Sequence, residues 1–175
     1  MVDAPTCPKC GSILVHNAPK GFARGPLHCL LPGCGYVDRD QPPRRTRIYV
    51  AAKFEEHARV REVYEELRYR GFEITYPWAE LALKNEKRIP TPEEWRKIGE
   101  DELQAVRTAD IILTLPHEHG LGLWVEYGIG LAFGKVILLV GEPRHDGPFF
   151  YLQGVRRVPT LSEAYRYLDE EVRSL

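Results

Sequence analysis

Residues 109–143 combine two apolar patterns in one continuous stretch. Short apolar runs at residues 111–115 and 136–140 flank a segment, 123–133, in which apolar residues recur at helical spacing. A glycine-bearing loop at residues 117–122 separates the first run from that segment. Apolar runs joined by an amphipathic helix are typical of a buried parallel strand–helix–strand unit. Ligands bind beyond the carboxyl ends of such strands, so we expect loop 117–122 to face a site.

The rest of the chain repeats the same alternation. Further strands are predicted at residues 48–52, 72–76 and 155–158, and further helices at residues 55–70, 91–108 and from residue 160. The last two helices begin with capping boxes at Thr91 and Thr160. Residues 79–90 are poorly patterned, and no element is predicted there. The fold class is therefore α/β, with a parallel sheet of about five strands and helices on both faces.

The first 40 residues carry a different signal, because all four cysteines fall there in two pairs. Two residues separate Cys7 from Cys10, four separate Cys29 from Cys34, and 18 separate the pairs. Four thiolates at such spacing can surround a zinc ion tetrahedrally. We therefore predict a zinc-ribbon-like domain over residues 1–40, with a structural zinc that supplies much of its stability. His16 and His28 are alternative ligands, although solvated loop histidines are the favoured interpretation.

Residues 38–47 are rich in proline and alternating charge, which predicts a linker before an α/β domain of residues 47–175. Arg44, Arg45 and Arg47 could contact nucleic acid beside the ribbon. A solvated linker is favoured, since these arginines lack interleaved aromatic residues.

Composition narrows the class of protein. The net charge of −1 provides no general attraction to nucleic acid or anionic membranes. No apolar run approaches the roughly 20 residues that span a bilayer, so no membrane partner is expected. The first residues lack the basic and apolar regions of a signal peptide. Paired cysteines in a metal-binding pattern fit a reducing compartment, and we expect a cytoplasmic protein.

Glu126 is the main candidate for chemistry. It lies inside the predicted helix of residues 123–133, among apolar and glycine residues, and a buried carboxylate is costly without a function. The alternative is that Glu126 is a first-turn glutamate stabilised by the helix dipole.

Several short segments together resemble one enzyme family. They are residues 48–54, 71–75, Trp78, 109–111, Gly122, 125–128 and 134–135. Their order and spacing resemble the nucleoside 2-deoxyribosyltransferases and the related deoxynucleoside monophosphate N-glycosidases. The resemblance implies a Rossmann-like, flavodoxin-related sheet, a homo-oligomer, and cleavage of the N-glycosidic bond of a nucleoside or nucleotide. It also implies that the enzyme uses no organic cofactor.

The resemblance also suggests roles for particular residues. It implies that Glu126 is the nucleophile and that Tyr49 forms a hydrogen bond near it. The family places an acid about eight positions before Asp110, which points to Glu102 or to the adjacent Asp101. Such an acid would protonate the leaving base. The alternative for both acids is a solvated helix face.

Candidate substrate contacts lie in three loops: Lys53, Tyr76, Trp78, Gly120 and Gly122. Aromatic rings at positions 76 and 78 could stack on a base. Glycines before a helix could bind an anion. The base, the sugar and the choice between transferase and hydrolase stay open. A rival function is a non-catalytic nucleotide-binding or sensing domain, with a ribbon that docks to nucleic acid or to a protein.

Overall fold

The computed structural model describes residues 7, 9–10, 14–16, 27–29, 34, 37–38, 45–85, 89–117 and 119–172. The chain divides into two units, with the boundary between residues 44 and 45. Each unit is described by itself. The predicted linker lies mostly outside the described residues.

The first unit contains a small antiparallel sheet in the order β1-β2-β3. Its strands are β1 (Leu14–His16), β2 (Leu27–Cys29) and β3 (Val37–Asp38). In the register of β1 and β2, Leu14 pairs with Cys29 and Val15 with His28. Of the four cysteines only Cys29 lies in one of these strands, and the short antiparallel sheet is compatible with the predicted ribbon.

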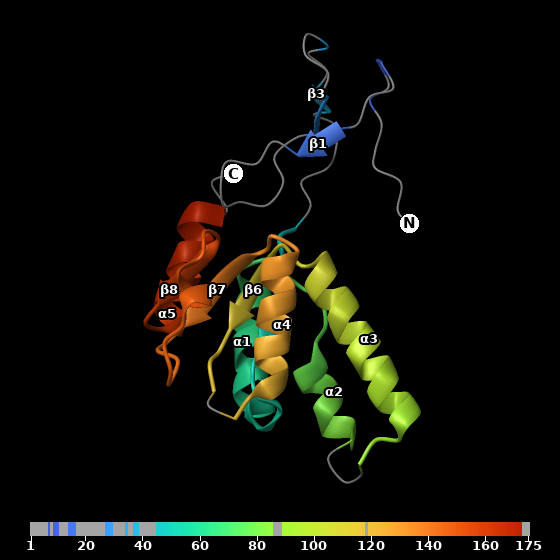
Figure 1. Ribbon diagram of the computed structural model, residues 1–175, viewed down its shortest axis with the longest axis vertical. Helices are drawn as coiled ribbons and strands as arrows, with labels where there is room; N and C mark the ends of the chain where they lie inside the picture. Colours follow the sequence, from blue (N-terminus) through green and yellow to red (C-terminus); the bar gives the residue numbers. More distant parts are fainter. Residues whose placement is uncertain are drawn as a thin grey trace. The chain divides into compact units, whose positions relative to one another are not determined.

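The second unit is built on a five-stranded parallel sheet (Figure 1). Its strands are β4 (Arg47–Ala51), β5 (Glu73–Ile74), β6 (Ile111–Thr114), β7 (Val136–Val140) and β8 (Val155–Val158). They lie in the order β5-β4-β6-β7-β8, and every pair is parallel. The prediction of an α/β fold with a parallel sheet is confirmed. The strand order reverses at β4 and β6, which is where ligands bind in open α/β sheets.

Helices cover both faces of this sheet. The main ones are α1 (His57–Tyr69), α3 (Pro92–Thr108), α4 (Leu121–Ala132) and α5 (Leu161–Tyr167). Figure 1 shows α4 in front of the sheet and α1 behind it. The helices α3 and α4 pack on each other, while Arg70 after α1 pairs with Asp169 after α5. No helix among the described residues is long and apolar enough to cross a membrane.

A glycine determines how closely α4 approaches the sheet. A Cβ atom at Gly130 would lie 2.9 Å from side-chain carbons of both Ile112 and Ile137. Real Cβ atoms do not approach so closely, so a larger residue would push α4 away from β6 and β7. This close packing brings the side chains of α4 within reach of the strands.

Both predicted capping residues are confirmed as helix caps. The side chain of Thr91 accepts a hydrogen bond from the Glu94 amide at the start of α3, and Thr160 does the same for Glu163 at α5.

Two predictions about local structure were wrong. Residues 79–90 were expected to form no element, but α2 spans Trp78–Asn85. Trp78 and Ala79 are buried, so burial stabilises a short helix for which the sequence gives no capping signal. The strand predicted at residues 72–76 is shorter, since β5 covers only Glu73–Ile74. The chain turns at Tyr76, and Pro77 has no amide hydrogen with which to extend the sheet.

Candidate functional site

The fold brings Glu126 and Tyr49 together across 77 positions of sequence. Tyr49 is fully buried in β4, and its hydroxyl donates a hydrogen bond of 2.8 Å to Oε1 of Glu126 in α4. Because α4 packs closely on the sheet, a strand side chain can reach a carboxylate on this helix.

The second carboxylate oxygen of Glu126 has an unusual environment. Oε2 is inaccessible to solvent and has no hydrogen-bond partner among the described residues. Burial raises the pKa of Glu126 to about 8, while the hydrogen bond from Tyr49 lowers this pKa and the charge of Glu102 raises it. A buried and incompletely hydrogen-bonded carboxylate is typical of a functional group rather than a stabilising one.

The position of Glu126 excludes the alternative that it is a first-turn glutamate. The helix α4 begins at Leu121, so Glu126 is its sixth residue, and the first turn contains no acidic residue. The interaction of a carboxylate with the helix dipole falls off within the first turn. That alternative is therefore wrong.

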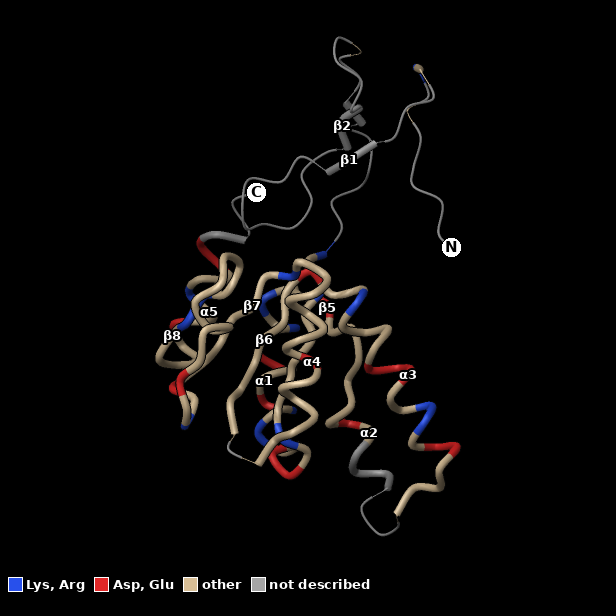
Figure 2. The backbone as a smooth tube through the Cα atoms, in the orientation of Figure 1, with Lys and Arg blue, Asp and Glu red and all other residues tan. Residues whose placement is uncertain are grey.

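The two candidate acids on α3 have different surroundings. Burial raises the pKa of Glu102, and its charge in turn raises the pKa values of Glu126 and Tyr49. Asp101 instead forms an ion pair of 2.9 Å with Lys97, and its side chain is 40% exposed. Figure 2 shows acidic and basic positions alternating along α3. Glu102 therefore belongs to the group around Glu126, whereas Asp101 lies mainly on the solvated side of the helix.

Tyr76 lies beyond the carboxyl end of β5, near both acids. Burial raises the pKa of its hydroxyl, and the charges of Asp101 and Glu102 raise it further. The ring is partly exposed, which leaves it accessible to a ligand.

Trp78 is largely buried, so little of its ring is available to stack on a base. It is 8% exposed, and its indole N–H donates a hydrogen bond of 2.9 Å to the carbonyl of Val50. Phe54 stacks on it with ring centroids 6.2 Å apart and is itself 58% exposed. The ring available for stacking is thus that of Phe54, a residue that the sequence analysis did not select. Its position just after the carboxyl end of a buried strand was the available signal.

The remaining predicted contacts lie around the carboxyl ends of β4 and β6. Lys53 precedes the 3₁₀ helix η1 (Phe54–Glu56), and its Nζ lies 3.5 Å from Glu55. Gly120 is the N-cap of α4, where a Cβ atom would lie 2.2 Å from the Leu123 side chain. Gly122 is exposed, with open space where a Cβ would lie. Gly122 thus leaves open space at the start of α4, whereas Gly120 is buried and makes room for the Leu123 side chain.

A cluster of cysteines lies in the first unit, where the zinc site was predicted. The sulfur atoms of Cys7, Cys10 and Cys34 all lie within 4.8 Å of one another, and Sγ of Cys7 is 3.8 Å from Sγ of Cys34. Thiolates bound tetrahedrally to zinc at about 2.3 Å lie about 3.8 Å apart, so this spacing fits zinc. Cys29 ends β2, but its side chain lies outside the described residues, as do those of His16 and His28.

The second unit is similar in sequence and in structure to known proteins. A family model described as nucleoside 2-deoxyribosyltransferase matches residues 48–149, more than half of the chain. The structure of the CMP N-glycosidase from Clostridium botulinum is similar, with a TM-score of 0.51, 18% identity, and coverage of 71% of this chain and 99% of that one. The 2-deoxyribosyltransferase from Bacillus psychrosaccharolyticus is also similar, with a TM-score of 0.54, 21% identity, and coverage of 70% and 92%. At these identities the two structures support the fold alone. A comparison with curated proteins finds no significant match.

Proposed function

Because the chain belongs to the nucleoside 2-deoxyribosyltransferase family, and is thus an enzyme of N-glycosidic bonds, we propose that Glu126 is its nucleophile. The observation that carries this proposal is the asymmetry of the Glu126 carboxylate. Tyr49 binds Oε1 at 2.8 Å, whereas Oε2 is buried with no partner among the described residues. One oxygen is therefore oriented by the protein, and the other has no hydrogen bond within the described residues that an attack on C1′ would have to break.

The proposed reaction has two steps. In the first, Oε2 of Glu126 forms a bond to C1′ of the sugar while the bond from C1′ to the base nitrogen breaks, and the base departs with the bonding electrons. The negative charge of the carboxylate stabilises the oxocarbenium-like transition state. In the second step, water or a second base attacks C1′, the bond from C1′ to Glu126 breaks and frees the carboxylate, and the proton of the attacking group passes to the Glu102 carboxylate. The acceptor determines whether the enzyme is a hydrolase or a transferase.

We assign protonation of the leaving base to Glu102. Burial raises its pKa, which favours the protonated form that a general acid needs. Its charge also acts on Glu126, which supports a position near the reacting group. Asp101 is the weaker candidate because Lys97 pairs with it.

We place the base beside the accessible rings of Phe54 and Tyr76, of which Tyr76 lies near the acids of α3. In this arrangement the ring of Trp78 stacks on that of Phe54 and helps to hold it in place. We assign to the sugar side Lys53, which precedes η1, and Gly120 and Gly122 at the start of α4. This assignment fits a nucleoside or a nucleotide as the substrate.

A panel of nucleosides and nucleoside monophosphates tests the activity. Incubation with the protein should release free base from at least one member, as measured by chromatography. Tight binding of a member without release of base from any would instead support the rival function of a nucleotide sensor. Addition of a second free base would then separate transfer from hydrolysis by the appearance of a new nucleoside.

We also propose that Cys7, Cys10, Cys29 and Cys34 bind one structural zinc ion. Three of these cysteines already cluster at a spacing that fits zinc. Burial alone would raise the pKa of the Cys7 thiol, but hydrogen bonds from the amides of Lys9 and Cys10 and from neighbouring thiols lower it to about 7. Four protein ligands would leave the metal no open position, so its role would be to stabilise the ribbon.

A further inference from the structure

A cleft lies beside α4, away from Glu126. Residues 141–154 connect β7 to β8, and their only helix is the four-residue 3₁₀ helix η2 (Pro148–Tyr151). A right-handed connection between these strands runs over the same face of the sheet as α4. Where a full helix would cover this face, the short η2 leaves a cleft of about 550 Å³.

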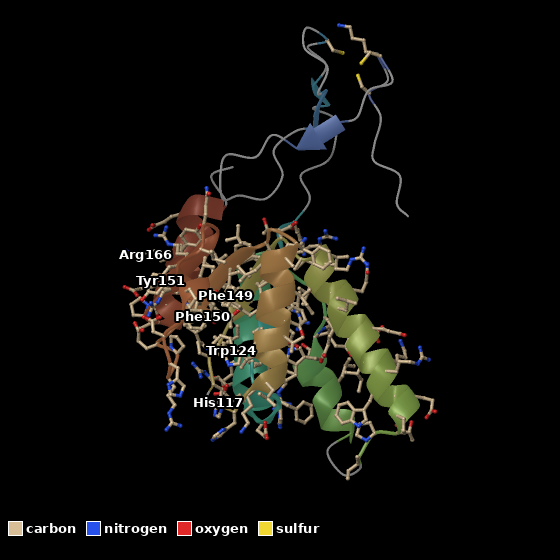
Figure 3. All side chains as sticks on the ribbon, in the orientation of Figure 1. His117, Trp124, Phe149, Phe150, Tyr151 and Arg166 are labelled. Carbon is tan, nitrogen blue, oxygen red and sulfur yellow. The ribbon has the colours of Figure 1, made fainter. Side chains whose placement is uncertain are left out.

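Aromatic side chains form one wall of the cleft. The ring centroids of Trp124 and Phe150 lie 5.4 Å apart, and Tyr127 packs edge-on against Phe150. The hydroxyl of Tyr127 donates a hydrogen bond of 2.8 Å to the carbonyl of Phe149, which fixes η2 against α4. Figure 3 shows Trp124, Phe150 and His117 on the side of α4 that faces β7 and β8. Trp124 and Phe150 are partly exposed, so a ligand can reach both rings.

Basic and imidazole side chains border this wall. His117, Arg144 and His145 line the cleft, and Glu142 supplies the only carboxylate among the described residues that line it. Both acidic residues of the loop, Glu142 and Asp146, form ion pairs with Arg157. The single charge of Arg157 thereby offsets part of their negative charge, so these two acids oppose an anion beside Arg144 less strongly.

The cleft is separate from the proposed catalytic group. Trp124 and Glu126 are two residues apart on α4, and an α-helix turns about 100° per residue, so their side chains point to nearly opposite sides. Glu126 faces Tyr49 of β4, whereas Trp124 faces Phe150 beside β8. A ligand in the cleft therefore does not occupy the position of the sugar bound at Glu126.

We propose that this cleft binds a second nucleotide. The base stacks on Trp124, and the phosphate lies towards Arg144 and the histidines that line the cleft. Every base has a flat face that can stack on an aromatic side chain, and a guanidinium binds phosphate oxygens well. The cleft volume lies in the range of small-molecule sites. The carboxylates of an acidic peptide could pair with Arg144, but they offer no planar ring to stack on the indole of Trp124. The combination of an aromatic wall and a cationic side chain therefore favours a nucleotide.

The test uses Glu126→Gln protein, so that the ligand is not consumed during titration. The probe is adenosine 5′-monophosphate, and adenosine and inorganic phosphate serve as separate arms. Calorimetry gives the number of sites per chain.

Trp124→Ala should weaken one binding event about 5- to 150-fold, the typical range for loss of one stacked base. Arg144→Gln, an exposed loop change that leaves the core intact, should weaken the same event for the monophosphate but not for adenosine. Trp95→Phe is the matched control, because Trp95 is 55% exposed on α3, outside the cleft lining, and should leave both events unchanged.

Fluorescence locates the event independently. In Trp95→Phe protein, the monophosphate should quench a signal that is missing when Trp124 is replaced by Phe. The proposal is overturned if the Trp124→Ala and Arg144→Gln proteins bind as the parent does. It is also overturned if a single site per chain is found, or if sedimentation shows that a second copy of the chain fills the cleft. Because binding is measured without turnover, this result does not depend on whether Glu126 is the nucleophile.

Discussion

At the scale of single residues, Tyr49 and Glu102 act on the Glu126 carboxylate in opposite directions. The hydrogen bond from Tyr49 favours the ionised form, and the charge of Glu102 disfavours it. A nucleophile must be ionised, so kcat/KM should rise about tenfold per pH unit towards the pKa of about 8. Tyr49→Phe should move this rising limb to higher pH, and Glu102→Gln should move it to lower pH. Glu102→Gln should also slow substrates with poor leaving bases most.

The control for these profiles is Tyr127→Phe. Tyr127 also carries a hydrogen-bonded hydroxyl, but its partner is the Phe149 carbonyl, and Tyr127 is not among the groups that shift the pKa of Glu126. The rising limb of the Tyr127→Phe pH profile should coincide with that of the parent protein. If the Tyr49→Phe and Glu102→Gln profiles shift in the same direction, the assignment of the limb to Glu126 fails.

The raised pKa of Glu126 also affects stability. The folded state holds its proton up to pH of about 8, whereas the unfolded chain releases it near the ordinary value of 4.5. The contribution of Glu126 to stability is thus lost as pH rises between these values. Glu126→Gln should stabilise the protein by about 1–3 kcal/mol above pH 8, and by little near pH 5. Thermal unfolding at pH 5 and pH 9 measures this; equal gains at both values would contradict it.

At the scale of elements, the capping box of α3 stabilises the helix that carries Glu102. Thr91 and Glu94 exchange hydrogen bonds of 3.3 Å and 2.8 Å. Thr91→Ala should cost about 1 kcal/mol of folding free energy, measured by denaturant unfolding. Base release should persist in the folded protein, because Glu102 lies about three turns further on, next to the buried Ala105 and Val106. Thr160→Ala is the matched control, because it removes the same kind of cap from α5, a helix remote from the acids. A loss of activity in Thr91→Ala but not in Thr160→Ala would show that the first turn of α3 also positions the site.

Elements with a strong period or a capping signal were predictable from sequence, and the others were not. The runs of β6 and β7 and the helix between them follow from apolar spacing, and α3 follows from its capping box. The helix α2 has no such signal in its sequence. It is stabilised instead by the burial of Trp78, which depends on the tertiary fold. The contact of Tyr49 with Glu126 spans 77 positions and depends on the packing of α4, which no local pattern encodes. For the same reason, sequence alone could not choose between the adjacent Asp101 and Glu102.

At the scale of the whole molecule, the two units should respond differently to loss of metal. The described part of the first unit contains short strands, whereas the second has an extensive buried core. Elemental analysis should find about one zinc ion per chain. Cys7→Ser should abolish zinc binding and unfold the ribbon, while the circular dichroism of the α/β unit persists. His28→Ala should keep the zinc; loss of metal in that variant, or no zinc in the parent purified without chelator, would contradict the four-cysteine site.

The measurement that tests the central claim most directly is the rate of base release by Glu126→Gln protein, with Glu100→Gln as the control. Glu100 is an exposed acid that pairs with Arg96, so its loss should leave the rate unchanged. Glutamine keeps the shape of the Glu126 side chain but removes the charge that the transition state requires. The expected rate is lower than that of the parent by roughly 100- to 1,000-fold or more. Release of base from the true substrate at the parent rate by the folded Glu126→Gln protein would contradict the assignment of the nucleophile.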